Sequence, residues 1–152
     1  MASSIAAIAL AAVVLPGGQP PAVGDRAGSA DRAGPVTKLT LKRSPYGRVV
    51  FSGGYARYVF TSDRSRESRC HDKCAAAWPP LEAAGELVAG RGVRARLLGT
   101  TVRADGSRQV TYRGRPLYGY VDDPRGKVYC HDVFEFGGTW YAVRKSGRPA
   151  PY

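Results

Sequence analysis

A gapless internal repeat constrains the fold of this sequence more than any other feature. Residues 48–74 align with residues 108–134 at a constant offset of 60, and Cys-His-Asp recurs at 70–72 and at 130–132. Trp78 and Trp140 follow the two copies, with a further shift of two residues. Two copies are too few for an open solenoid. We therefore expect two similar units that bury their faces against each other about a pseudo-two-fold axis.

Short strands joined by tight turns are predicted within each unit. Residues 36–42 alternate apolar and polar side chains with the period of a strand. The turns at 52–54 and 113–115 each separate two apolar runs, as in a hairpin. The remaining predicted elements are strands at 93–103, 117–121 and 139–144, and one short helix at 71–78 that Pro79 and Pro80 end. The sequence predicts an all-β fold of antiparallel hairpin units from two tandem repeats (about 46–81 and 106–147), packed as one small domain at 36–147.

The N-terminal residues have the pattern of a targeting segment. Residues 5–15 form an uncharged apolar run that is too short to span a bilayer, which needs about 20 residues. We expect a signal-like segment at 1–16 and a flexible Gly/Pro/Ala linker at 17–35. The first cysteine is Cys70, so the sequence offers no cysteine for lipid attachment after the apolar run. The prediction is a protein that is secreted or lies on the extracytoplasmic face of the cell envelope.

Paired motifs carry a family resemblance. Tyr-x-aromatic-x-x-Asp occurs at 58–63 and 118–123, joined by Cys-x3-Cys-x3-Trp-Pro-Pro-Leu at 70–81 and followed by Phe-Gly-Gly-x-Trp-Tyr at 136–141. With these motifs the chain resembles the bacterial secreted-repeat family, predicted lipoproteins that bear the Tyr-x4-Asp motif and have no known function. The resemblance implies a secreted or envelope-anchored protein with tandem repeats. Cys130 and the missing lipid-attachment cysteine depart from the family pattern.

The motif residues have a structural and a functional interpretation. The set comprises Tyr58, Phe60, Asp63, Tyr118, Tyr120 and Asp123. In a strand, each tyrosine points to the same face as the aromatic residue two positions later, which favours core packing, and each aspartate falls where a turn can accept backbone N–H bonds. The alternative is a carboxylate pair for acid–base chemistry or a cation, with Asp122, Asp123 and Asp132 as candidate calcium ligands.

The cysteines and histidines allow a disulfide or a metal site. Cys70 and Cys74 are close enough to pair, and oxidation is expected after export. Cys70–Cys130 is the alternative pairing, because the repeat places these two residues in equivalent loops. The sharper hypothesis is a Cu or Zn site. Its ligands would be Cys70, His71, Cys74, Cys130 and His131.

Charge suggests the kind of partner. The formal net charge is +11, and basic residues cluster at 64–69, 91–96 and 108–115. Export argues against a nucleic-acid partner, so we favour anionic envelope polymers or lipid headgroups. No nucleophile-elbow or phosphate-loop motif is present. We expect a non-enzymatic extracytoplasmic binding or structural module that needs no cofactor. The alternative is an envelope redox or metal-handling protein that uses the Cys/His cluster.

Overall fold

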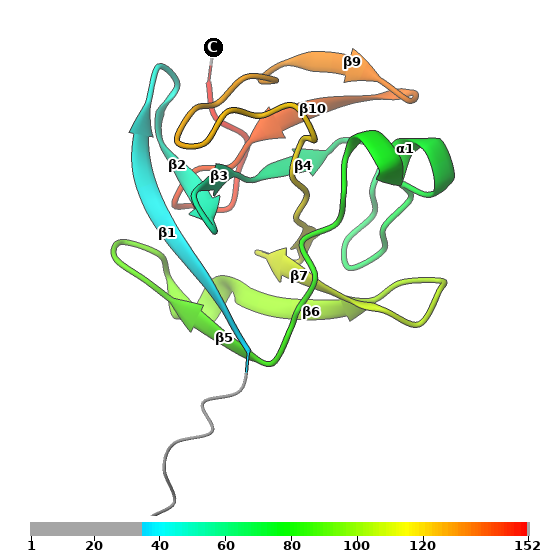
Figure 1. The fold of residues 1–152 in the computed structure, drawn as a ribbon, viewed down its shortest axis with the longest axis horizontal. Coiled ribbons are helices and arrows are strands. Elements are labelled where there is room, and N and C mark those ends of the chain that lie inside the picture. Colours follow the sequence, from blue (N-terminus) through cyan, green and yellow to red (C-terminus); the bar gives the residue numbers. More distant parts are fainter. Residues whose placement is uncertain (1–34, 152) are drawn as a thin grey trace, which may run out of the picture. The chain divides into compact units, whose positions relative to one another are not determined.

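Short strands dominate the computed structural model, which describes residues 35–151 (Figure 1). The predicted segments at 1–16 and 17–35 lie outside the described residues, apart from Pro35. The strands are β1 Val36–Ser44, β2 Gly47–Ser52, β3 Tyr55–Ala56, β4 Tyr58–Phe60, β5 Glu86–Ala89, β6 Leu98–Val102, β7 Arg108–Tyr112, β8 Arg115–Pro116, β9 Val133–Glu135 and β10 Gly138–Ala142. One α-helix, α1 (Asp72–Ala77), and one 3-10 turn, η1 (Ala95–Leu97), complete the described secondary structure.

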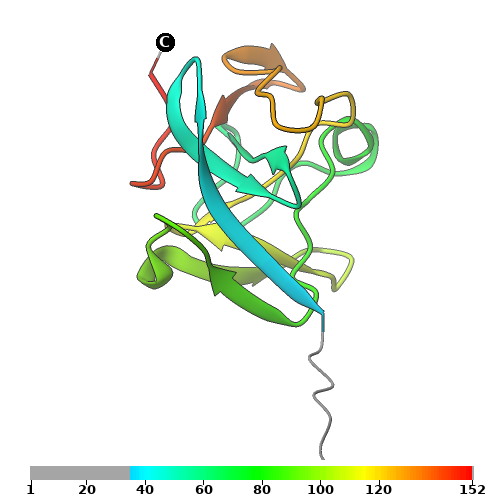
Figure 2. The same ribbon diagram turned by 60° about the vertical axis from the view of Figure 1, so that its left-hand side comes forward.

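The strands form three small sheets, with orders β3-β2-β1-β5, β4-β10-β9 and β6-β7-β8. The long strand β1 runs from the region of β5 and β6 toward the β9–β10 hairpin, as both views show (Figures 1 and 2). Alternate β1 residues are buried, among them Leu39 and Leu41, because the period of two in this segment places its apolar side chains on one face. Leu41 pairs with Val50 of β2, which is fully buried.

The predicted all-β class is confirmed, and α1 confirms the short helix predicted near 71–78. Two strand predictions were wrong in extent. The strand expected at 93–103 begins only at Leu98, because residues 95–97 turn as η1. The strand expected at 117–121 is reduced to isolated bridges at Tyr118. The parallel pairing of β5 with β1 was not predicted, because β5 lies in the link between the repeats and has no counterpart in them.

The two repeats meet at a pair of equivalent tyrosines. Tyr58 and Tyr118 form an antiparallel bridge in which each backbone N–H donates to the other's carbonyl oxygen at 3.0 Å. Tyr58 also pairs with Ala142, and at the matching position Tyr118 pairs with Pro80. The hairpin of each repeat therefore pairs with the segment that follows the tryptophan of the other repeat. These reciprocal pairings agree with two similar units that pack against each other, and the pseudo-two-fold axis itself stays a prediction.

The tryptophans that follow each repeat stack on each other in the core. The rings of Trp78 and Trp140 are 4.0 Å apart and nearly parallel, at 3°, and both residues are fully buried. Tyr58 packs edge-on against Trp78, and Tyr118 packs edge-on against Trp140. Such edge contacts add to the stabilisation that aromatic burial provides. This aromatic part of the core thus consists of matched contacts between the halves, so neither repeat completes it alone.

Candidate functional site

The two copies of the Tyr-x4-Asp motif bond to each other rather than to themselves. The Tyr58 hydroxyl donates to the Asp123 carboxylate of the second repeat, at 3.0 Å to Oδ1 and 2.8 Å to Oδ2. The Tyr118 hydroxyl donates to Asp63 Oδ2 of the first repeat at 2.8 Å. Sequence spacing associates each aspartate with the tyrosine of its own copy. The structure instead joins the repeats through two reciprocal hydrogen bonds.

Each aspartate also binds the backbone of the turn that follows it. The Arg69 N–H donates to Asp63 Oδ1 at 2.8 Å, and the Tyr129 N–H donates to Asp123 Oδ1 at 3.2 Å. Residues 69 and 129 are equivalent in the repeat, so the two turns are built alike. These contacts agree with the interpretation of the aspartates as turn-binding residues. They add the buried tyrosine partner, which that interpretation did not include.

The buried surroundings change how these groups titrate. Burial raises the pKa of Asp63 to about 6, against the opposing effects of its hydrogen bonds from Arg69 and Tyr118. Burial raises the pKa of Asp123 as well, and its bonds from Tyr58 and Tyr129 oppose that shift. The pKa of each tyrosine rises through burial and the adjacent carboxylate. The hydroxyl protons therefore stay on Tyr58 and Tyr118 at neutral pH, where they serve as donors.

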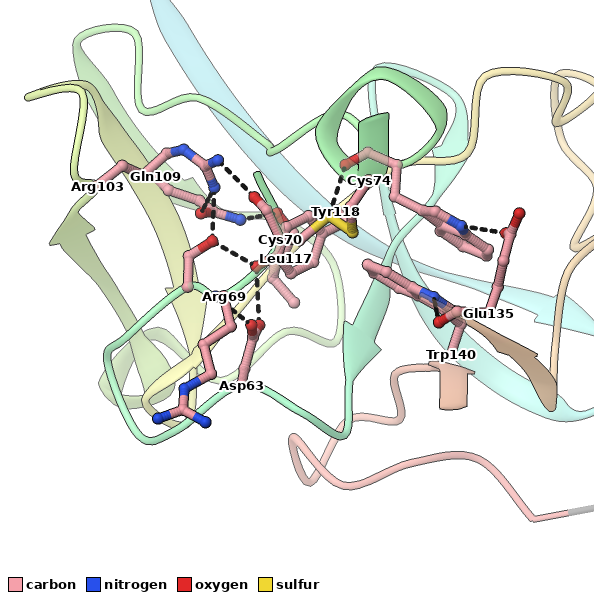
Figure 3. Close-up of a disulfide and its surroundings, with 12 residues drawn as sticks. Asp63, Arg69, Cys70, Cys74, Arg103, Gln109, Leu117, Tyr118, Glu135 and Trp140 are labelled. Carbon is pink, nitrogen blue, oxygen red and sulfur yellow. Dashed lines mark hydrogen bonds between the residues drawn. A yellow bond between two sulfur atoms is a disulfide. The ribbon is translucent and has the colours of Figure 1, made fainter. Parts of the chain in front are cut away.

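A buried arginine extends the Asp63–Tyr118 contact into a network (Figure 3). The Tyr118 hydroxyl lies 2.8 Å from Ser68 Oγ, which accepts from Arg103 Nη1 at 2.7 Å. Arg103 also donates from Nη1 to the Gln109 side chain at 2.8 Å and from Nη2 to the Cys70 carbonyl at 2.7 Å. The Arg103 side chain is only 3% exposed. This cation ties the β6–β7 hairpin to the disulfide loop, and the sequence offers no sign of it.

The cysteines pair as the shorter spacing predicts. Cys70 and Cys74 form a disulfide, and the alternative Cys70–Cys130 pairing was wrong. Cys130 is a free, partly buried thiol. Burial and the nearby Asp123 carboxylate raise its pKa, which disfavours the reactive thiolate. The cysteine that departs from the family pattern thus occupies the position equivalent to Cys70, without a second cysteine to pair with it.

The candidate Cu or Zn ligands are differently engaged in the structure. The disulfide occupies Cys70 and Cys74. His131 accepts from the Ala142 N–H through Nδ1 at 3.2 Å, and its Nε2 lies 3.2 Å from the Pro151 carbonyl oxygen. His71 is exposed at the start of α1. Within residues 35–151, no three His, Cys, Asp or Glu side chains are grouped so that they could hold a metal ion.

Basic side chains line three adjoining grooves on the surface. The largest, here called the C-terminal groove, has a volume of about 500 Å³ and no acidic lining residue. It is lined by Arg48, Arg94, Arg113, Arg144, Lys145, Ser146 and Arg148. Two smaller grooves of about 250 Å³ each adjoin it, because Arg113 lines all three. The three grooves therefore meet at Arg113, and together they are called the basic surface.

The two smaller grooves bring in arginines from other segments. The β6–β7 groove is lined by Arg66, Arg96 and Arg113 together with residues of β6 and β7. The Asp63 groove is lined by Arg64, Arg113 and Arg115, with Asp63 as its one acidic residue. Ten of the chain's 23 Lys and Arg residues thus line the basic surface. The ion pairs found within residues 35–151, Arg69–Glu67 and Arg103–Asp105, involve none of these ten.

The basic surface was only partly visible in the sequence. Each of the predicted basic clusters at 64–69, 91–96 and 108–115 contributes arginines to it. Arg48 and residues 144–148 were missed, because single basic residues far apart in the chain form no local pattern. The pairing of β2 with the chain end, through the Val49–Arg144 bridge, brings them together.

Comparison with known proteins gives one similarity. Residues 99–144 match the model of a family described as a secreted repeat of unknown function. The match runs from within β6 to two residues beyond β10 and so covers most of the second repeat. No curated protein and no solved structure matches the chain. In the part of the chain that the structure describes, no helix is long and apolar enough to cross a bilayer. Over its second repeat this chain is similar to secreted repeats of unknown function, and that similarity supports an extracellular location.

Proposed function

We propose that this protein is a non-enzymatic binding module for anionic polymers of the cell envelope. The observation that carries the proposal is the basic surface, where ten Lys and Arg side chains line three grooves that meet at Arg113 and contain a single carboxyl group. The similarity of the second repeat to secreted repeats supports a site of action outside the cytoplasm.

The composition of the grooves favours phosphate or carboxylate ligands. Arginine presents a planar fork of N–H donors that matches these groups, and nine of the ten basic residues are arginines. Within the described residues none of the ten has an acidic partner to displace before binding. The net charge of +11 adds a long-range field that attracts anions. Binding would therefore be electrostatic and sensitive to salt.

The motif residues support this proposal because their side chains are engaged inside the protein, which leaves the exposed basic residues to contact a ligand. Tyr58 and Tyr118 are fully buried, and each aspartate of the motif accepts from a tyrosine hydroxyl and a backbone N–H. Because these residues hold the two repeats together, we assign ligand contact to the exposed loops. Arg48, Arg94, Arg113, Arg144 and Arg148 of the C-terminal groove are all exposed.

Binding of long-chain polyphosphate, measured by titration calorimetry, tests the proposal. We expect binding that weakens at least about tenfold between low and physiological salt, because each phosphate contact releases counterions. Dextran, a neutral polymer, should not bind. Arg94→Ala combined with Arg144→Ala removes two groove charges and should weaken binding strongly. The matched control combines Arg91→Ala with Lys127→Ala, which removes two exposed charges outside the three grooves and should have little effect.

Two outcomes would contradict the proposal. Equal losses in the groove variant and in the control variant would mean that only net charge matters and that the grooves bind nothing specifically. Strong binding to vesicles that contain phosphatidylglycerol, without binding to soluble polyanions, would identify a lipid surface as the partner instead.

A further inference from the structure

We infer that the ligand of the basic surface is a linear polyanion that crosses all three grooves over Arg113. This inference rests on the proposed function and adds to it the form of the ligand and the residue at its centre. Arg113 is the one side chain that lines the C-terminal groove, the β6–β7 groove and the Asp63 groove alike. A chain of charges that passes from one groove to the next therefore passes Arg113.

The backbone conformation at Arg113 shows that the turn itself does not favour an arginine at this position. Arg113 lies in the left-handed region, at φ 55°, where residues with a Cβ are rare. The equivalent position in the first repeat is Gly53, at φ 61°. Glycine adopts this conformation without strain, so the first repeat carries the residue that the turn favours. The second repeat places a long basic side chain at the same position despite its backbone cost.

The Arg113 side chain is also held in place. Gly147 lies so close that a Cβ there would come within 2.5 Å of the Arg113 Cβ, so the side chain packs directly on the backbone of the C-terminal turn. Arg113 Nη1 donates to the Ser146 carbonyl at 3.3 Å. These contacts hold the guanidinium beside the C-terminal groove while the residue remains exposed. A guanidinium held in this way loses less freedom when it binds an anion.

The distribution of charge favours a chain over a single anion. Arg66 and Arg96 line only the β6–β7 groove, and Arg64 and Arg115 line only the Asp63 groove. A single phosphate can contact the residues of one groove, whereas a linear polyanion contacts several at once. Linked contacts strengthen binding beyond each single contact, because every later contact forms within the same complex. Affinity should therefore grow with chain length.

Polyphosphates of graded length test the inference. We expect affinity, expressed per binding site, to rise from pyrophosphate through tripolyphosphate to long-chain polyphosphate. Arg113→Gly should weaken binding of the long chain about tenfold and flatten the length dependence, since all three grooves lose a contact. Arg96→Ala, which changes one groove, should weaken it about threefold and lower the salt slope by about 1. Arg91→Ala, outside the three grooves, is the charge-matched control.

The folded state is checked in the same variants. Arg113→Gly introduces the residue found at the matching turn of the first repeat, so the melting temperature of this variant should equal or exceed that of the wild type. Arg113→Asn, which also tolerates the left-handed region, serves as the second variant. Equal per-site affinities for tripolyphosphate and the long chain, or an Arg113→Gly loss no larger than that of Arg91→Ala, would overturn the inference. Failure to bind polyphosphate of any length would instead refute the proposed function.

Discussion

Removing the Tyr58 hydroxyl tests whether the repeats are joined by reciprocal hydrogen bonds. Tyr58→Phe keeps the ring that packs on Trp78 and deletes the donor to Asp123. Asp123 is 6% exposed, so its carboxylate would keep the Tyr129 N–H and lose its shortest bond. The Tyr129 and Cys130 N–H groups would lose the Tyr58 oxygen as an acceptor.

The expected cost follows from the charge and burial of the pair. A hydrogen bond to a charged group contributes about 1.5–3 kcal/mol, and an unsatisfied buried acceptor adds to the loss. We expect Tyr58→Phe to lower the free energy of unfolding by about 2–3 kcal/mol. For a domain of this size that corresponds to a fall of roughly 8–12 °C in melting temperature. The measurement is thermal or urea unfolding without reductant, so that the Cys70–Cys74 disulfide stays intact.

Double-mutant cycles then identify the partner. Tyr58→Phe with Asp123→Ala should give a coupling energy of about 1.5–3 kcal/mol, because the two side chains are in contact. Tyr58→Phe with Asp63→Ala, the pair within one motif copy, should couple by less than about 0.5 kcal/mol. Equal coupling in the two cycles, or stronger coupling within one copy, would refute the reciprocal arrangement.

Three other predictions concern charge, strain and thiols. Burial raises the pKa of Asp63 to about 6, so the stabilisation from its protonation is fully present below about pH 4 and is lost as pH rises through 6. The free energy of unfolding of Asp63→Asn, relative to that of the wild type, should therefore increase from pH 4 to pH 8. A difference that does not change with pH would contradict the raised pKa. Phe136 is exposed and lies at φ 55° before Gly137, so Phe136→Asn should raise the free energy of unfolding by about 1 kcal/mol, and a fall in melting temperature would count against strain at this turn. Thiol titration of the unfolded protein should find one reactive thiol before reduction, Cys130, and three after it, and three before reduction would rule out the disulfide.

The repeat explains why so much of the core could be predicted from sequence. Tyr58 and Tyr118 recur at a constant offset, and each precedes an aromatic residue by two positions, so their common burial follows from strand geometry. The Cys70–Cys74 pairing follows from short spacing and the expected oxidising location. These features are local, and local spacing is what a single sequence displays best.

Long-range partners could not be predicted in the same way. Each aspartate binds the tyrosine of the other repeat because of how the two units dock. The spacing of residues within one unit does not specify that docking. By its sequence position Arg103 resembles a solvent-exposed arginine at the end of a strand. In the structure it is buried where the β6–β7 hairpin meets Ser68 and Cys70. Arg48 and Arg148 join one groove only because β2 lies beside the chain end.

Backbone amide chemical shifts during a titration with long-chain polyphosphate would test the central proposal most directly. The basic surface predicts the largest changes at Arg94, Arg96, Arg113 and residues 144–148. Salt should reduce these changes, and in Arg113→Gly they should need about tenfold more polyphosphate. Arg69, residues 71–74 and Phe136 line a different groove, next to the disulfide, and their signals should stay unchanged. Changes centred on residues 69–74 and Phe136, with the signals of Arg113 and residues 144–148 unmoved, would contradict the account.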